Sequence, residues 1–246
     1  MVWLASDIHL GPDAPATRGA FLKFLDSAAQ QADALVLCGD IFDAWIGDDA
    51  AVAAPPDWLR EVLHSLQKTS NAIPLWLGRG NRDFLMGERL ASHLGAHLLP
   101  DPCRILTDLG PVLVSHGDEY CTADTQYQRF RKIVRSDWVQ RLFLGLGLNL
   151  RRKIALWARE RSRASGRGKR ADIMDVAPEA IHEAFRNADV EIMVHGHTHR
   201  PARHGLRVDG RNRSRYVLPD WECDHASPPR GGWLAIDRNG ITARTL

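Results

Sequence analysis

Residues 34–49 read ALVLCGDIFDAWIGDD, and this stretch contains the pattern that decides the predicted fold. Its first five residues are apolar and lead into Gly39-Asp40, and so short an apolar run suits a buried strand better than a helix. Four more short apolar runs end in small or polar residues, at 2–5, 74–77, 112–114 and 191–194. Amphipathic helical patterns at 17–30 and 57–70 separate the first three of the five runs. This alternation is typical of an α/β fold, and short antiparallel strands are expected after it, at 215–218, 232–237 and 241–244.

Polar side chains follow each of the five predicted strands at the point where the strand ends. In chain order they belong to the segments Asp7-Ile8-His9, Gly39-Asp40, Gly80-Asn81-Arg82-Asp83, His116-Gly117-Asp118 and His195-Gly196-His197-Thr198-His199. Ligands of open α/β sheets bind beyond the carboxyl ends of the strands. We therefore expect aspartate, asparagine and histidine side chains from all five segments to meet in one crevice.

These side-chain types favour a metal centre over a simple general acid–base pair. Carboxylate, amide and imidazole ligands suit divalent Mn, Fe, Co or Zn, and the absence of cysteine from these five segments argues against a structural zinc site. Seven ligands are too many for one ion and fit two ions that share one carboxylate. Two ions roughly 3.5–4 Å apart can hold a hydroxide between them and bind a phosphoryl group. An isolated histidine is usually structural, and we assign that role to His64, His93, His97, His182, His204 and His225.

Length and composition narrow the possibilities further. The 246 residues are 44% hydrophobic and 25% charged with a formal net charge of +2, which predicts one globular domain, 1–246, and not a uniformly basic protein. Four cysteines without CxxC spacing favour reduced thiols in the cytoplasm. The glycine motifs of P-loop, dinucleotide-binding and α/β-hydrolase proteins are absent. The N-terminus lacks the features of a signal peptide, and the apolar stretch 142–148 is far shorter than the about 20 residues that span a bilayer.

Residues 126–170 differ in charge from the rest of the chain. They hold 14 lysines and arginines against two acids, a net charge of +12, so the remaining residues together carry −10 of the total of +2. Helix-forming residues dominate this segment, with Trp138, Leu142, Phe143, Leu146 and Trp157 placed among the charges. We interpret it as a helical insertion with one apolar and one cationic face, although a charge run is more often only a solvated surface.

The segments DIH, GDIFD, GNRD, HGD and HGHTH together resemble the calcineurin-like metallophosphoesterases. A closer resemblance, to the UDP-2,3-diacylglucosamine pyrophosphatases of lipid A biosynthesis, rests on GDIFDAWIGDD, GNRDFLMG, HGDEYCTADTQYQRFRK, IMDV and HGHTHRPARH. This resemblance implies a four-layer αββα sandwich with a helical lid insertion at about 126–170. It also implies hydrolysis of UDP-2,3-diacylglucosamine to UMP and 2,3-diacylglucosamine 1-phosphate, usually with two Mn²⁺ ions.

The resemblance further implies two overlapping sets of metal ligands, Asp7, His9, Asp40 and His197 for one ion and Asp40, Asn81, His116 and His195 for the other. It implies substrate contacts from Asn81, Arg82, Asp124 and His195, and from a Ser-x3-Asn-x2-Lys pattern of the lid that reads here as Ser162, Gly166 and Lys169. Asn81, Arg82, His116 and His195 would be catalytic. Arg82 stands where many phosphodiesterases have a histidine, and a guanidinium cannot be a general acid near neutral pH but can bind a diphosphate with two hydrogen bonds. That favours an acidic leaving group such as a sugar phosphate, displaced from the α-phosphorus by a hydroxide between the ions.

Four positions depart from the family pattern: Arg79 in place of histidine, Ala123 in place of aspartate, Gly166 in place of asparagine, and PDWE at 219–222 in place of GDWY. None of them removes a predicted metal ligand, so they concern substrate contacts. Two other functions are considered: a dinuclear phosphoesterase acting on nucleotides, and a non-enzymatic scaffold that binds polyanions through 126–170. The expected partners are the acylated UDP-sugar and the anionic cytoplasmic face of the inner membrane, bound peripherally, without nucleic acid and as a monomer.

Overall fold

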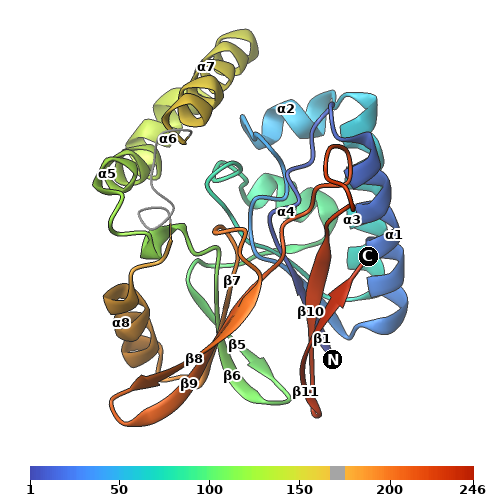
Figure 1. Ribbon diagram of the computed structural model, residues 1–246. Helices are drawn as coiled ribbons and strands as arrows, with labels where there is room; N and C mark the ends of the chain where they lie inside the picture. The colour runs from blue at the N-terminus through green and yellow to red at the C-terminus, as the bar shows by residue number, and fades with distance from the viewer. Residues whose placement is uncertain (167–174) are drawn as a thin grey trace.

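Two β-sheets pack face to face in the computed structural model, with helices outside them (Figure 1). The structure describes residues 1–166 and 175–246, with side chains described except at 159–166. The first sheet has the strand order β11-β10-β1-β2-β3-β4 and the second has the order β5-β6-β7-β9-β8. All four cysteines are free thiols, as predicted.

The first sheet contains the three N-terminal predicted strands. Its parallel strands are β1 (Val2–Ala5), β2 (Ala34–Leu37), β3 (Leu75–Leu77) and β4 (His97–Leu98). The hairpin of β10 (Gly232–Asp237) and β11 (Gly240–Thr245) extends it antiparallel beyond β1. Its outer face carries the helices α1 (Pro15–Gln31), α3 (Asp57–Ala72) and α4 (Glu88–Leu94), with α2 (Asp48–Ala53) beside them.

The second sheet contains the other two predicted strands. They are β6 (Gly110–Ser115) and β7 (Ile192–His195), which run parallel to β9 (Arg211–Val217). The antiparallel strands β5 (Cys103–Thr107) and β8 (Ala202–Val208) close the two edges. The strand predicted at 215–218 therefore does not join the C-terminal hairpin, because it pairs with β7 and β8 in this sheet.

Strand alternation builds the core as layers. In β2, Leu35 and Leu37 pack against the helices while Val36 faces the second sheet. In β7, Val194 faces the first sheet while Met193 packs with α8 (Pro178–Ala188), which covers the outer face. The order of layers, helices, sheet, sheet and helix, thus confirms the predicted αββα sandwich. The apolar cluster that Met193 forms with Ile181 and Phe185 of α8 covers the outer face of the second sheet.

The helical insertion leaves the sandwich as an arm of three helices, α5 (Thr125–Val134), α6 (Asp137–Leu144) and α7 (Leu148–Gly166) (Figure 1). We call this arm the lid. Neither α5 nor α6 has a buried residue, and large apolar side chains such as Trp138 and Leu142 are exposed. Among the residues described, no helix is long and apolar enough to cross a membrane.

Candidate active site

Loops from both sheets meet where five strands end. Backbone hydrogen bonds tie them together: Asp7 N–H donates to the carbonyl of Gly39 at 3.1 Å, and Gly196 N–H donates to that of His116 at 2.9 Å. The two sheets are joined by His197 N–H, which donates to Asp7 Oδ2 at 2.9 Å. The five segments therefore meet between two sheets, because β1, β2 and β3 belong to one and β6 and β7 to the other.

The backbone of these loops is strained at the polar residues themselves. In the described part of the chain seven non-glycine residues have positive φ, and five of them lie in the predicted site: Asp7, His9, Asp40, His197 and His199, with φ between 51° and 66°. Such a conformation costs about 1–3 kcal/mol per residue and persists only where its surroundings enforce it. Strain gathered on chemically reactive side chains is the mark of a functional site.

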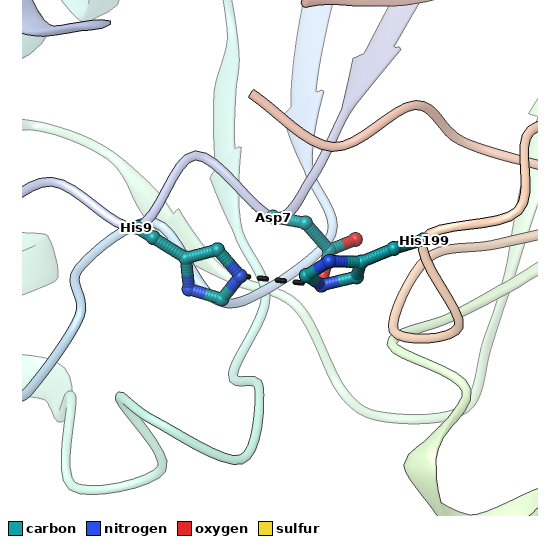
Figure 2. Close-up of side chains that lie close together, drawn as sticks. All are labelled: Asp7, His9 and His199. Atoms are coloured by element: carbon teal, nitrogen blue, oxygen red, sulfur yellow. Dashed lines mark hydrogen bonds and ion pairs between the residues drawn. The ribbon is translucent and has the colours of Figure 1, made fainter. Parts of the chain in front are cut away.

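The first group of side chains is Asp7, His9 and His199, which point toward one another (Figure 2). The Nε2 atoms of His9 and His199 lie 3.3 Å apart, and His199 Nε2 lies 3.4 Å from Asp7 Oδ1. Their three ligand atoms fall within 4.8 Å of one another. Two imidazoles and one carboxylate at this spacing can bind a divalent metal ion.

The second group is Asp40, Asn81, His116 and His197. Asn81 Oδ1 lies 3.0 Å from His116 Nε2 and 2.9 Å from His197 Nδ1. Asp40 stands between the two groups, with Oδ1 3.7 Å from His116 Nε2 and Oδ2 3.8 Å from His9 Nδ1. A carboxylate in this position can bridge two ions.

The side chain of Asp83 holds the backbone around Asp40 in place. This buried carboxylate accepts hydrogen bonds from the backbone N–H groups of Gly80 at 2.7 Å and Ile41 at 2.7 Å, and from those of Asp40 and Phe42 at 3.2 Å. Asp40 Oδ1 in turn accepts from Arg82 N–H at 2.7 Å. Gly80 has to be glycine, because a Cβ there would lie 2.1 Å from Asp40 Oδ1.

Charge and burial at this site are out of balance without a cation. Burial, with Asp83 and Asp7 nearby, raises the pKa of Asp40 to about 7, although His116 opposes the shift. Burial lowers the pKa of His116, yet the carboxylates of Asp40 and Asp7 raise it overall to about 9. Asp7 Oδ1 and His9 Nδ1 are buried and have no hydrogen-bond partner. Divalent cations fit this donor set, because they would balance the carboxylates and occupy the unpartnered atoms.

The sequence pattern of the calcineurin-like phosphoesterases matches residues 1–201. The chain belongs to this family. A protein of Bordetella pertussis named UDP-2,3-diacylglucosamine hydrolase is 59% identical over 240 residues, 98% of this chain and 93% of its own length. Proteins of the same name from Coxiella burnetii (43% identical, 88% and 87% covered) and Pseudomonas aeruginosa (42% identical, 97% and 96% covered) are also similar to it. The resemblance inferred from the motifs is thereby confirmed.

His195, the seventh predicted metal ligand, has its hydrogen-bond partners outside the two groups. It ends β7 on the same face as Met193, and its Nε2 lies 2.8 Å from Nη1 of Arg215. A guanidinium can only donate, so Nε2 accepts and the protonated Nδ1 donates to the carbonyl of Gly196 at 2.9 Å. Burial and Arg215 lower the pKa of His195 to about 3. His199, which was not predicted as a ligand, lies beside Asp7 and His9, while His197 lies beside Asn81.

Of the other predicted substrate contacts, the structure describes the side chains of Arg82 and Asp124 only. Arg82 is partly exposed at the site, with Nη1 3.7 Å from Asp43 Oδ1. Asp124 caps the first turn of α5, where its Oδ1 accepts from Tyr127 N–H at 3.0 Å. Ser162 and Gly166 fall in the last turns of α7, where side chains are not described, and Lys169 lies outside the described residues.

Tyr127 and Asp118 are site residues that sequence reasoning missed. The ring of Tyr127 stacks on His197 at 6.2 Å between centroids, and its hydroxyl donates to Asp118 Oδ2 at 2.5 Å. Tyr127 therefore brings the first helix of the lid over the second ligand group. The signal for Asp118 was its place in His116-Gly117-Asp118, directly after a predicted strand.

Proposed function

We propose that the protein hydrolyses the diphosphate bond of UDP-2,3-diacylglucosamine to UMP and 2,3-diacylglucosamine 1-phosphate. The observation that carries this proposal is similarity to the three relatives of that name over 88–98% of the chain, at 42–59% identity. The matched length extends beyond the phosphoesterase pattern and includes residues of the C-terminal hairpin. The two groups of side chains provide the chemistry that such a hydrolysis needs.

The ligand sets we propose are those that the motifs predict. Asp7, His9, Asp40 and His197 would hold one ion, and Asp40, Asn81, His116 and His195 the other, with Mn²⁺ as the proposed metal. Asp7, Asp40 and His116 lie close enough together to share an ion, and His199 is a further candidate beside Asp7 and His9. When bound, two such ions supply Lewis acidity toward the phosphoryl oxygens and activate a water.

Arg82 is the residue proposed to bind the diphosphate. Its side chain is 29% exposed beside the bridging Asp40, and its backbone N–H already holds that carboxylate. A guanidinium makes two parallel hydrogen bonds to phosphate oxygens and stabilises the charge that develops there. Because the departing sugar phosphate is itself acidic, attack at the α-phosphorus needs no general acid at position 82.

The lid is proposed to accommodate the acyl chains and to contact the membrane surface. Phe130, Trp138 and Leu142 are 51%, 62% and 65% exposed, among basic residues of the same helices. Apolar side chains of this kind bind acyl groups, and each basic residue near an anionic bilayer contributes about 1 kcal/mol. We therefore propose peripheral association with the cytoplasmic face of the inner membrane.

Turnover in ¹⁸O water tests the reaction directly. The full-length enzyme with Mn²⁺ is given UDP-2,3-diacylglucosamine in detergent micelles, and Asn81→Ala serves as the inactive control. Labelled UMP would support both the substrate and attack at the α-phosphorus. Label in the lipid phosphate alone would contradict the direction of attack. Cleavage of a simple phosphodiester without turnover of the lipid substrate would overturn the substrate assignment while leaving the metal site intact.

A further inference from the structure

Arg151 is an exception among the residues of the lid. It is 2% exposed, and within 126–158, the part of the insertion whose side chains are described, it is the one buried residue. Its neighbours Arg152 and Lys153 are exposed. Burying a guanidinium is costly unless its hydrogen bonds are satisfied, so the position of Arg151 requires a specific partner.

That partner is the start of α2 together with the loop before it. Arg151 Nη1 donates to the carbonyl of Ile46 at 2.7 Å and to Asp49 Oδ1 at 2.8 Å, and Nη2 donates to Asp49 Oδ2. The guanidinium thus grips the carboxylate with both of its terminal nitrogens, the strongest arrangement of such a pair. Gly47 leaves room for it, since a Cβ there would lie 2.5 Å from Arg151 Nη1, and its φ of +125° suits glycine.

The same loop is bonded to the catalytic region. Trp45 N–H donates to the carbonyl of Arg82 at 3.2 Å. Asp48 accepts from Trp45 Nε1 at 2.9 Å and from the N–H groups of Gly87 and Leu90 at the start of α4. Asp48 therefore fixes the loop to the sandwich, while the adjacent Asp49 faces the lid. The two consecutive aspartates connect α7 to the residue that would bind the diphosphate.

We propose that the Asp49–Arg151 pair is a positioning device that fixes the lid relative to Arg82 and so determines how tightly the acylated part of the substrate is bound. This inference rests on the proposed function for the identity of the substrate. The pair acts through the lid and does not touch the reacting atoms. Its loss should therefore weaken binding of a diacylated substrate while leaving the hydrolysis of a small phosphodiester unchanged.

The test compares two substrates on the Mn²⁺-loaded full-length enzyme. For Asp49→Asn and Arg151→Met, KM for UDP-2,3-diacylglucosamine should rise about tenfold, while kcat/KM for bis(4-nitrophenyl) phosphate stays within about twofold of the wild type. The double variant should be no worse than either single one, because both remove the same interaction. The more conservative Arg151→Lys keeps the charge and loses the two-pronged grip, and should show most of the effect.

A matched pair on α3 provides the control. Asp57 and Arg60 are also within hydrogen-bonding distance, at 2.7 Å, but both are well exposed and far from the lid in sequence. Asp57→Asn should change neither substrate's kinetics. Equal effects of Asp49→Asn on both substrates, or an unchanged KM for the diacylated one, would overturn the proposal and indicate a purely structural ion pair.

Hydrogen exchange separates this proposal from the proposed function. In Asp49→Asn the amides of α6 and the first turns of α7 should exchange at least about tenfold faster than in the wild type, with α1 and α3 unchanged. If the wild type failed to hydrolyse the diacylated substrate, the proposed function would fall, yet this exchange measurement would still decide whether the pair holds the lid. Unchanged exchange in the lid helices would contradict the positioning role whatever the substrate.

Discussion

The loops that carry the proposed metal ligands, which we call the ligand loops, are held to the protein by different contacts from those that hold the lid. The loops rest on three apolar clusters and on a buried carboxylate, Asp83, that binds four backbone N–H groups. The lid is attached largely through arginines, with Arg151 on Asp49 at one end and Arg131 and Arg135 on Asp118 at the other. The difference teaches that the ligand loops depend on apolar packing and backbone hydrogen bonds, while the lid that would meet the acyl chains is joined by contacts sensitive to charge.

The Asp118 end of the lid lies close to the ligand groups. Asp118 Oδ2 accepts from Arg131 Nε at 2.8 Å and from Arg135 Nη2 at 3.3 Å, and Arg135 also donates to the carbonyl of Gly80. Burial alone would raise the pKa of Asp118, but His116, Arg135 and Arg131 lower it below its ordinary value. Removal of a single charge should therefore disturb the lid more than the sandwich.

The largest expected effect lies in the ligand loops, at His197. His197→Ala should lower kcat/KM by at least about a thousandfold and reduce bound Mn²⁺, because it removes a predicted ligand whose Nδ1 lies 2.9 Å from Asn81 Oδ1. His204→Ala, at an exposed histidine of β8, should keep its Mn²⁺. Metal content by electron paramagnetic resonance, measured beside activity, decides between them, and equal loss of Mn²⁺ in both variants would contradict the ligand role of His197.

The second effect concerns the support of the same loops. Asp83→Ala should lower the free energy of unfolding by about 3 kcal/mol or more, because it leaves four backbone N–H groups without their acceptor. Urea unfolding measures this. Asp26→Ala on the surface of α1, which loses only an exposed ion pair with Lys68, should change stability by about 0–1 kcal/mol. A similar loss in both variants would refute the anchoring role of Asp83.

The third effect is smaller and lies at the base of the lid. The pKa of Asp118 is lower in the folded protein than in the unfolded chain. The ionised carboxylate therefore stabilises the folded protein at pH values above the ordinary aspartate pKa of about 3.9, and this stabilisation is lost as the pH falls below it. Asp118→Asn should therefore be less stable than the wild type at pH 7 by about 1–3 kcal/mol, and the difference should shrink as the pH falls below about 4. Thermal unfolding across pH measures it, and a difference independent of pH would contradict the charge-based account.

The smallest effect is expected at the outer surface of the lid. Replacing both Trp138 and Leu142 with serine should weaken binding to vesicles that contain anionic lipid, since both side chains are exposed. Raising the salt concentration should weaken binding of the wild type, because charge attraction is screened. Cleavage of bis(4-nitrophenyl) phosphate should stay unchanged. Sedimentation with vesicles gives the bound fraction, and salt-independent binding would remove the electrostatic part of the proposal.

The sequence predicted the framework of the sandwich and most of its chemistry. Short apolar runs located β1, β2, β3, β6 and β7 because a strand buried on both faces has no polar alternation. Six of the residues predicted as metal ligands lie in the two groups, since each directly follows one of these strands. The contact between His195 and Arg215 was not visible from spacing, because it depends on the pairing of β7 with β9.

The contacts between distant segments were beyond the reach of the sequence. Nothing local distinguishes Arg151 from its neighbours Arg152 and Lys153, because its burial depends on a loop about a hundred residues earlier in the chain. The same holds for the pairing of β9 with β7, which separates it from the C-terminal hairpin. Local patterns predict elements, whereas these choices are made by tertiary packing.

The division of the ligands between two sheets has a consequence for the endurance of the protein. Asp7, His9, Asp40 and Asn81 follow strands of the first sheet, while His116, His195 and His197 lie at or after the ends of strands of the second. Ions held by both halves would act as cross-links across the sandwich. At a free metal concentration a hundred times the dissociation constant, each ion would add about 2.7 kcal/mol to the free energy of unfolding. A chelator that removes the ions would thus lower the free energy of unfolding, so that metal supply in the cell would affect the lifetime of the enzyme as well as its rate.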